Sequence, residues 1–179
     1  LLTEKCDQTC VMCSQPPKNK DYLHWDLYKK AIDFIPNGSL IGITGGEPTL
    51  YKKELLDFLI YAIQKNSSLY FHVLTNGQHF NSSDIEKLKQ LNKNVVWAVP
   101  LYGATSEIHD LIVGKPGAFR RLENNFIYLL SSNSKVELRS CVLKQNYTDL
   151  INLSRYISIN FQWVQNWAIM QLEPIGFSI

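Results

Sequence analysis

Cys6-Asp7-Gln8-Thr9-Cys10-Val11-Met12-Cys13 places three of the chain's four cysteines within eight residues, in the spacing C-x3-C-x2-C. We interpret the rest of the chain as a scaffold for this loop. A disulfide framework is disfavoured, because disulfide-dense domains are short and only Cys141 is left to pair. A structural zinc site needs a fourth ligand; His24 is the nearest candidate, and the sequence has no second C-x2-C pair. The third interpretation is an iron–sulfur cluster with one iron open to a ligand, since catalytic metal sites keep one position open.

Length and composition narrow the class of protein. The chain has 179 residues, of which 45% are hydrophobic, as expected for one globular domain. The net charge is +2 and no basic block stands out, so we expect no nucleic-acid partner. No apolar run approaches the roughly 18 residues that cross a membrane, and residues 1–4 lack the features of a signal peptide. Clustered thiols without a signal predict a cytoplasmic protein.

Hydrophobic periodicity predicts strands that alternate with helices. Residues 1–3 read as the end of a truncated strand, so we expect residues 1–179 to be one core domain excerpted from a longer chain. A capping box of Ser83 and Glu86 is expected to open the third helix. The further predicted strands cover 40–44, 69–74, 95–101, 136–143 and 167–173. The predicted helices cover 25–35, 52–65, 83–91, 119–130 and 148–159, and 104–118 is predicted as loop with at most a short helical turn.

This alternation predicts an α/β fold with a parallel sheet and right-handed crossovers. Six strands fit a partial (β/α)6 TIM-like barrel. Sites in parallel α/β folds lie at the carboxyl ends of the strands. Gly45, Thr75, Tyr102, Leu143 and Glu173 all fall at such ends, as does the cysteine loop. The candidate motifs are therefore expected to meet at one rim.

A second motif, Thr44-Gly45-Gly46-Glu47-Pro48, follows the cysteines by about thirty residues. Together the two motifs resemble the radical S-adenosylmethionine (radical SAM) superfamily. The resemblance implies a partial (β/α)6 barrel in which Cys6, Cys10 and Cys13 hold a 4Fe–4S cluster. It further implies that the fourth iron binds S-adenosylmethionine, which is cleaved reductively to a 5′-deoxyadenosyl radical that takes hydrogen from a substrate. A reductant such as flavodoxin or ferredoxin is implied as a partner.

The diglycine turn has two interpretations. Gly45 and Gly46 let the backbone turn sharply and come close to a ligand. By resemblance, Gly45, Gly46 and Glu47 contact the methionyl ammonium of the cofactor. The alternative is a strand-to-helix turn in which Glu47 and Pro48 favour a helix start.

Arg139 lies inside a predicted strand. Alternation along that strand puts Glu137, Arg139 and Cys141 on one face, opposite an apolar face that should meet the helices. Arg139 could then clamp the carboxylate of S-adenosylmethionine, as the resemblance implies. The alternative is an internal salt bridge to Glu137 or Glu173. We interpret Cys141 as a small buried apolar residue rather than a ligand.

The remaining cofactor contacts follow from the resemblance. Thr75 and Asn76 begin a Thr-Asn-Gly run that can face the cofactor, although a simple Asn-Gly turn is the alternative. Met12 replaces an aromatic residue that is common in the family and can still cover the adenine. Tyr102 is the candidate for the ribose, and the backbone near Leu172 for the adenine. On the last strand, Gln171 or Glu173 is predicted to reach the substrate.

Three short runs give a finer resemblance: Cys-Ser-Gln-Pro-Pro at 13–17, Pro-Leu-Tyr-Gly-Ala-Thr at 100–105 and Leu-Glu-Pro-Ile-Gly-Phe at 172–177. They resemble the maturases of His-Xaa-Ser repeat peptide-modification systems. This implies a ribosomally made peptide as substrate, in place of a small molecule. The alternative function from another class is a non-catalytic α/β scaffold that binds zinc, a cluster or a nucleotide.

Overall fold

The computed structural model describes residues 1–15 and 20–172. Its centre is a five-stranded sheet whose neighbouring strands are all parallel. The strands are β1 (Leu40–Ile43), β2 (Tyr70–Leu74), β3 (Val95–Pro100), β4 (Lys135–Val142) and β5 (Asn166–Gln171). The α-helices are α1 (Trp25–Ala31), α2 (Lys52–Lys65), α3 (Ile85–Leu91), α4 (Ser106–Val113), α5 (Ala118–Ser131) and α6 (Leu150–Asn160). Three short 3-10 helices are η1 (Ile32–Phe34), η2 (Pro48–Tyr51) and η3 (Ser82–Asp84).

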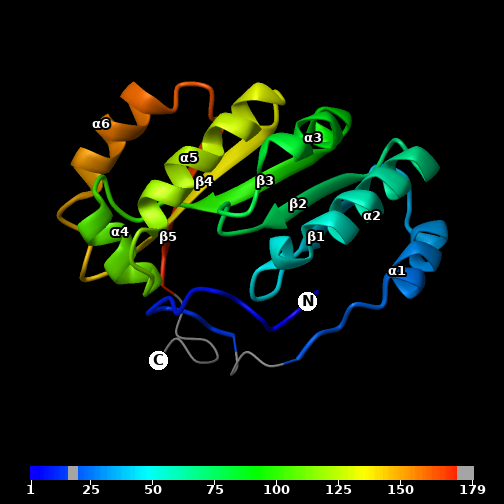
Figure 1. The fold of residues 1–179 in the computed structure, drawn as a ribbon, viewed down its shortest axis with the longest axis horizontal. Coiled ribbons are helices and arrows are strands. Elements are labelled where there is room, and N and C mark those ends of the chain that lie inside the picture. Colours follow the sequence, from blue (N-terminus) through cyan, green and yellow to red (C-terminus); the bar gives the residue numbers. More distant parts are fainter. Residues whose placement is uncertain (16–19, 173–179) are drawn as a thin grey trace.

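The strands follow one another in the sheet in the order of the sequence, β1-β2-β3-β4-β5. When every crossover has the same hand, this order puts the connecting helices on one side and curls the sheet toward a barrel. Figure 1 shows α2, α3, α5 and α6 on one side of the sheet, while the N-terminal segment runs along the opposite margin. The predicted α/β architecture of a partial parallel barrel is confirmed.

The core lies between the sheet and these helices. Phe71, Trp97 and Leu138 point from the strands toward the helices and are at most 1% exposed. Leu59 from α2 and Leu122 from α5 lie in the same buried cluster. Each such side chain contributes about 1.5–3 kcal/mol when it leaves water. Because this face is filled with apolar side chains, the polar residues of the sheet are left for the other face and for the strand ends.

The sequence placed the long elements to within two residues, but three predictions were wrong. Residues 106–113 form helix α4 where a loop was expected. The capping box consists of Asn81 and Asp84, because the chain enters α3 through the earlier turn η3. In the part of the chain that the structure describes, the sheet has five strands rather than six. Residues 1–3 make a single bridge, Thr3 with Asp21, and Leu2 N donates to Thr44 O over 2.8 Å.

None of the helices within residues 1–15 and 20–172 combines the length and the apolar character needed to cross a bilayer. Some predictions fall on positions outside these described residues. They are Glu173 as the end of the last strand and as a partner of Arg139 or of substrate, and the parts of the finer resemblance at Pro16-Pro17 and at residues 173–177.

Candidate functional site

A cavity of about 340 Å³ opens at the carboxyl ends of the strands, beside the cysteine loop (residues 6–13). Of the twelve residues predicted for the site, Leu172 is the one that does not line it; Leu172 is 38% exposed just beyond β5. The other eleven do: Cys6, Cys10, Met12, Cys13, Gly45, Gly46, Glu47, Thr75, Asn76, Tyr102 and Arg139. The expectation that the motifs meet at one rim is therefore confirmed, while the role of each residue stays a prediction.

The three clustered cysteines are all half-buried in this cavity, and no disulfide joins any of the four cysteines, all of which the structure describes. Local contacts shape the loop between them. Cys6 Sγ accepts from Gln8 N over 3.4 Å, and Cys13 N donates to Cys10 O over 3.1 Å. The loop thus turns its thiols toward the cavity without a cross-link.

The diglycine turn packs directly against residues 2–5, which lead into the cysteine loop. A Cβ on Gly46 would lie 2.1 Å from Lys5 O, and one on Gly45 would lie 2.5 Å from Thr3 O. Gly46 N donates to Thr3 O over 2.6 Å and Glu47 N donates to Lys5 O over 2.7 Å. Only a residue without a side chain allows this approach. The diglycine turn is therefore joined through its backbone to the segment immediately before Cys6.

Glu47 is 1% exposed, and its carboxylate is surrounded by donors. Thr49 N donates to Oε1 over 2.7 Å, Thr75 Oγ1 donates to Oε1 over 2.6 Å, and Asn76 N donates to Oε2 over 2.5 Å. The Thr49 hydroxyl donates to Oε1 as well. Burial raises the pKa of Glu47, and these donors oppose the rise because they favour the charged form. Glu47 caps η2, whose first residue is Pro48, so the helix start considered as the alternative is present, while contact of this turn with a cofactor stays a prediction.

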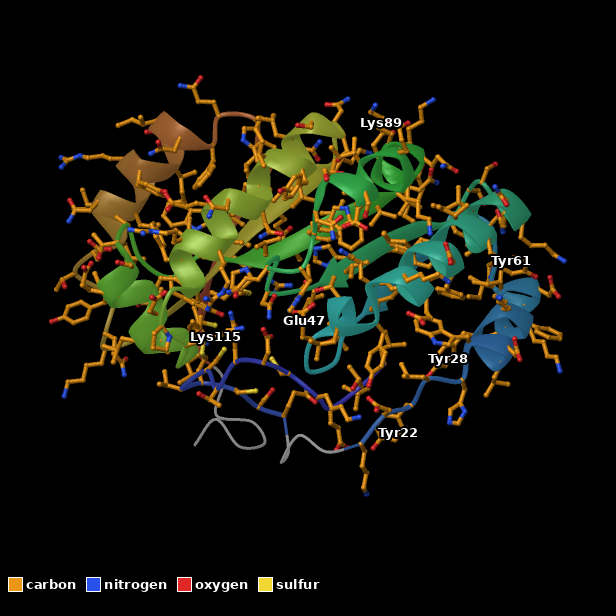
Figure 2. The ribbon with its side chains drawn as sticks, in the orientation of Figure 1. Tyr22, Tyr28, Glu47, Tyr61, Lys89 and Lys115 are labelled. Atoms are coloured by element: carbon orange, nitrogen blue, oxygen red, sulfur yellow. The ribbon has the colours of Figure 1, made fainter. Side chains whose placement is uncertain are left out.

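The turn after β2 extends the hydrogen-bond network of Glu47 to the cysteine loop, through Asn76. Asn76 Nδ2 donates to Asp7 Oδ1 in the cysteine loop over 2.7 Å. Lys115, which follows α4, donates to Asp7 Oδ2. Figure 2 shows Glu47 and Lys115 along the margin that faces the N-terminal segment. Asp7 and Lys115 were missed from the sequence. Signals for α4 were present, because Ile108, Leu111 and Ile112 have helical spacing and Gly114 is a left-handed C-cap.

β4 presents Arg139 to the cavity from its inner face. The burial of β4 alternates as predicted, with Val136, Leu138 and Ser140 buried. Arg139 Nε lies 3.7 Å from Glu137 Oε1, which is the internal salt bridge considered above. Arg139 Nη2 lies 2.9 Å from Met170 Sδ. Neither contact is a bidentate carboxylate pair, so with respect to the residues that the structure describes, the guanidinium keeps donors for a ligand.

The structure places Cys141 and Gln171 differently from what the sequence predicted. Cys141 was expected to be buried, yet it is half-buried and lines the cavity together with the other three cysteines. Its position follows from alternation, which puts it on the face of Arg139. On β5, Met170 rather than Gln171 lines the cavity, while Gln171 is exposed. Gln171 therefore does not line this cavity, and its contact with a substrate stays a prediction.

Tyr102 follows β3 and lines the cavity near Cys10 and Cys141. Burial and the nearby thiols raise the pKa of Tyr102 well above its ordinary value, so its hydroxyl stays protonated and can donate. Tyr102 N donates to His109 Nδ1 over 3.3 Å. His109 is 1% exposed, and burial lowers its pKa to about 4. A neutral imidazole on α4 therefore supports the backbone of this tyrosine.

The donor set fits a cluster better than a single ion. Within the described residues, no three His, Cys, Asp or Glu side chains gather as ligands of one metal ion. The thiolates that hold an iron–sulfur cluster bind different irons, so they need not converge on one point. Three half-buried thiols around one cavity satisfy that looser requirement.

The fold and the site together define a partial parallel barrel with a thiol-lined cavity at its strand ends. The family model described as Radical SAM superfamily matches residues 1–157. The chain therefore belongs to the radical SAM superfamily.

Three relatives illustrate the similarity. The antilisterial bacteriocin subtilosin biosynthesis protein AlbA of Bacillus subtilis is 24% identical over 93% of this chain and 39% of its own length. Streptococcus suis SuiB bound to S-adenosylmethionine matches with a TM-score of 0.75 and 20% identity, over 97% of this chain and 40% of SuiB. The enzyme anSMEcpe with bound AdoMet and Kp18Cys peptide matches with a TM-score of 0.72 and 16% identity, over 96% and 49%. This chain spans half or less of the length of these three relatives.

Proposed function

We propose that this chain carries radical SAM chemistry, with Cys6, Cys10 and Cys13 holding a 4Fe–4S cluster beside bound S-adenosylmethionine. The observation that carries the proposal is that these three thiols share one cavity with the diglycine turn and Arg139. When bound, the cluster and S-adenosylmethionine supply hydrogen-atom abstraction, driven by one-electron cleavage of a sulfur–carbon bond. The residues of the chain bind and orient these groups. Residues 1–179 are proposed to act as one core domain, which the single continuous core supports.

Each polar group has a proposed part. The free donors of Arg139 suit the carboxylate of S-adenosylmethionine. The backbone carbonyls of the diglycine turn suit its ammonium, because the Glu47 carboxylate is already engaged by four donors. The protonated Tyr102 hydroxyl suits the ribose, and Met12 can cover an adenine face.

Anaerobic reconstitution with iron and sulfide, followed by chemical reduction in the presence of S-adenosylmethionine, tests this function. We expect bound iron and sulfide and the formation of 5′-deoxyadenosine. Cys10→Ala should lose both. Cys141→Ala is the matched control, since it removes a thiol from the same cavity, and we expect its iron content to match the wild type. Full iron in Cys10→Ala, or none in Cys141→Ala, would refute this ligand set.

The finer proposal is a peptide substrate. It is supported by the bacteriocin-biosynthesis name of AlbA and by a SuiB structure bound to the precursor peptide SuiA, which matches with a TM-score of 0.74. The three short runs noted above favour a peptide with His-Xaa-Ser repeats. Synthetic peptides with and without such repeats should differ in how strongly they raise 5′-deoxyadenosine formation, with a mass change in the better one. Flavodoxin and ferredoxin are the proposed reductants, to be compared with dithionite in the same assay.

A further inference from the structure

We propose that Asp7 and Lys115 form a positioning pair that fixes the cysteine loop on the rim. The junction between α4 and α5 would then set where the three thiols lie. The functional consequence rests on the proposed cluster at these cysteines, but the position of the loop is measurable without metal.

Asp7 is the meeting point of three separate segments. Its Oδ1 accepts from Asn76 Nδ2 over 2.7 Å, which ties it to the turn after β2. Its Oδ2 accepts from Lys115 Nζ and lies 3.4 Å from His79 Nε2. Lys115 and Asp7 therefore form an ion pair that joins the cysteine loop to the segment after α4.

The pair is partly shielded from water. The Asp7 side chain is 24% exposed and the Lys115 side chain 26%. Fully exposed ion pairs contribute little, because water and salt screen them, whereas shielded pairs are strong enough that removing one partner is costly. Without Lys115, the second carboxylate oxygen of Asp7 would keep only the 3.4 Å approach of His79 among the contacts described here.

The backbone next to Lys115 holds the loop as well. Thr9 N donates to Val113 O over 3.0 Å and Val11 N donates to Ile112 O over 2.9 Å. These carbonyls end α4, where a helix has no partners of its own for them. The Thr9 hydroxyl donates to Gly114 O over 3.1 Å.

Gly114 makes this contact possible. It has a left-handed φ of +63°, and a Cβ there would lie 2.6 Å from Thr9 O. Cys10 therefore sits between two residues whose amides bind the end of α4. The ion pair from Lys115 holds the start of the same loop, one residue after Cys6.

Hydrogen exchange of the metal-free protein, read by mass spectrometry, is the direct test. Lys115→Met should speed exchange of the loop peptide containing Thr9 and Val11 by roughly threefold to tenfold, as expected for a partly shielded pair. Lys115→Arg, which keeps the charge, should restore slow exchange. Lys87→Met is the matched control, because Lys87 pairs with Asp57 between α3 and α2, away from the loop. The α5 peptide serves as the internal reference for global opening.

A double-mutant cycle sharpens the result. If Asp7→Asn and Lys115→Met act through one contact, the double variant should exchange no faster than the worse single variant. After reconstitution, Lys115→Met should lose iron to a chelator several-fold faster than Lys87→Met, with the Arg variant close to wild type.

The outcomes separate the two proposals. Equal loop exchange in Lys115→Met and Lys87→Met would overturn the positioning pair, whether or not a cluster binds. Additive effects of the two single variants, or failure of Lys115→Arg to restore protection, would also overturn it. Suppose instead that Lys115→Met speeds exchange of the loop, but the wild-type protein binds no cluster on reconstitution. The positioning pair would then be supported, and the proposed function would be refuted.

Discussion

On one side of the cavity the Glu47 carboxylate accepts four hydrogen bonds, whereas on β4 the Arg139 guanidinium meets Glu137 at 3.7 Å and a thioether. We call the first side the held wall, made of residues 45–47, 75–76 and the cysteine loop. We call the second the open wall, made of Tyr102, Arg139, Cys141 and Met170. A side chain whose hydrogen bonds are all made within the protein holds the shape of a site, whereas a side chain with unused donors can bind a ligand there. The held wall should therefore matter most for stability and the open wall for ligand affinity.

The largest expected effect is on the held wall. Glu47→Ala removes the acceptor of two hydroxyls and two backbone amides that are buried around it. Each buried donor left unpaired costs about 1–3 kcal/mol, so we expect the free energy of unfolding to fall by about 3 kcal/mol or more. Urea denaturation of the metal-free protein measures it. Glu86→Gln is the control, since that side chain is 80% exposed, and it should change stability by less than about 0.5 kcal/mol. A Glu47→Ala protein as stable as the control would contradict the distinction between the walls.

A pH series tests the support behind the open wall. Burial lowers the pKa of His109 to about 4, whereas the ordinary pKa of histidine, expected in the unfolded chain, is 6.5. Between these values the unfolded state binds more protons, so stability is full above the unfolded pKa and is lost as pH falls from about 6.5 toward 4. The loss amounts to at most about 3 kcal/mol. His109→Asn should flatten this slope, and a variant that keeps the wild-type slope would remove His109 as its source.

Two glycines on one side of the sheet give the next comparison. A Cβ on Gly46 would lie 2.1 Å from Lys5 O, while one on Gly42 would meet nothing within 4 Å. Gly46→Ala should destabilise the protein by about 1–3 kcal/mol, because the backbone of Glu4 and Lys5 must move. Gly42→Ala should be neutral or slightly stabilising, since alanine restricts the unfolded chain. Thermal unfolding of both variants measures this, and equal midpoints would show that the turn at Gly46 and the strand at Gly42 do not pack as described.

The sequence anticipated most of the residues that line the two walls, but not the long-range contacts that tie the held wall together. Alternation in β4 was enough to put Arg139 and Cys141 on the cavity face, because strand period is a local property. The bond from Asn76 to Asp7 joins residues 69 positions apart, and the bond from Lys115 to Asp7 spans 108. Such contacts depend on how the strand ends and α4 come together in space. No pattern of residue types within a window of sequence encodes them.

The smallest expected effect on stability belongs to Arg139→Met. In this variant the Glu137 carboxylate would keep His72 Nε2 at 3.4 Å from Oε1 and Asn166 Nδ2 at 3.2 Å from Oε2. Because the carboxylate keeps these neighbours, the free energy of unfolding should change by less than about 1 kcal/mol. Binding of S-adenosylmethionine to the reconstituted protein should weaken by about tenfold, which corresponds to about 1.4 kcal/mol. Equilibrium dialysis measures the affinity, and Arg155→Met on the exposed face of α6 is the control. The Arg139 guanidinium has donors to spare, whereas the Glu47 carboxylate already accepts four hydrogen bonds. Unchanged affinity together with lost stability in Arg139→Met would therefore reverse the roles assigned to the two walls.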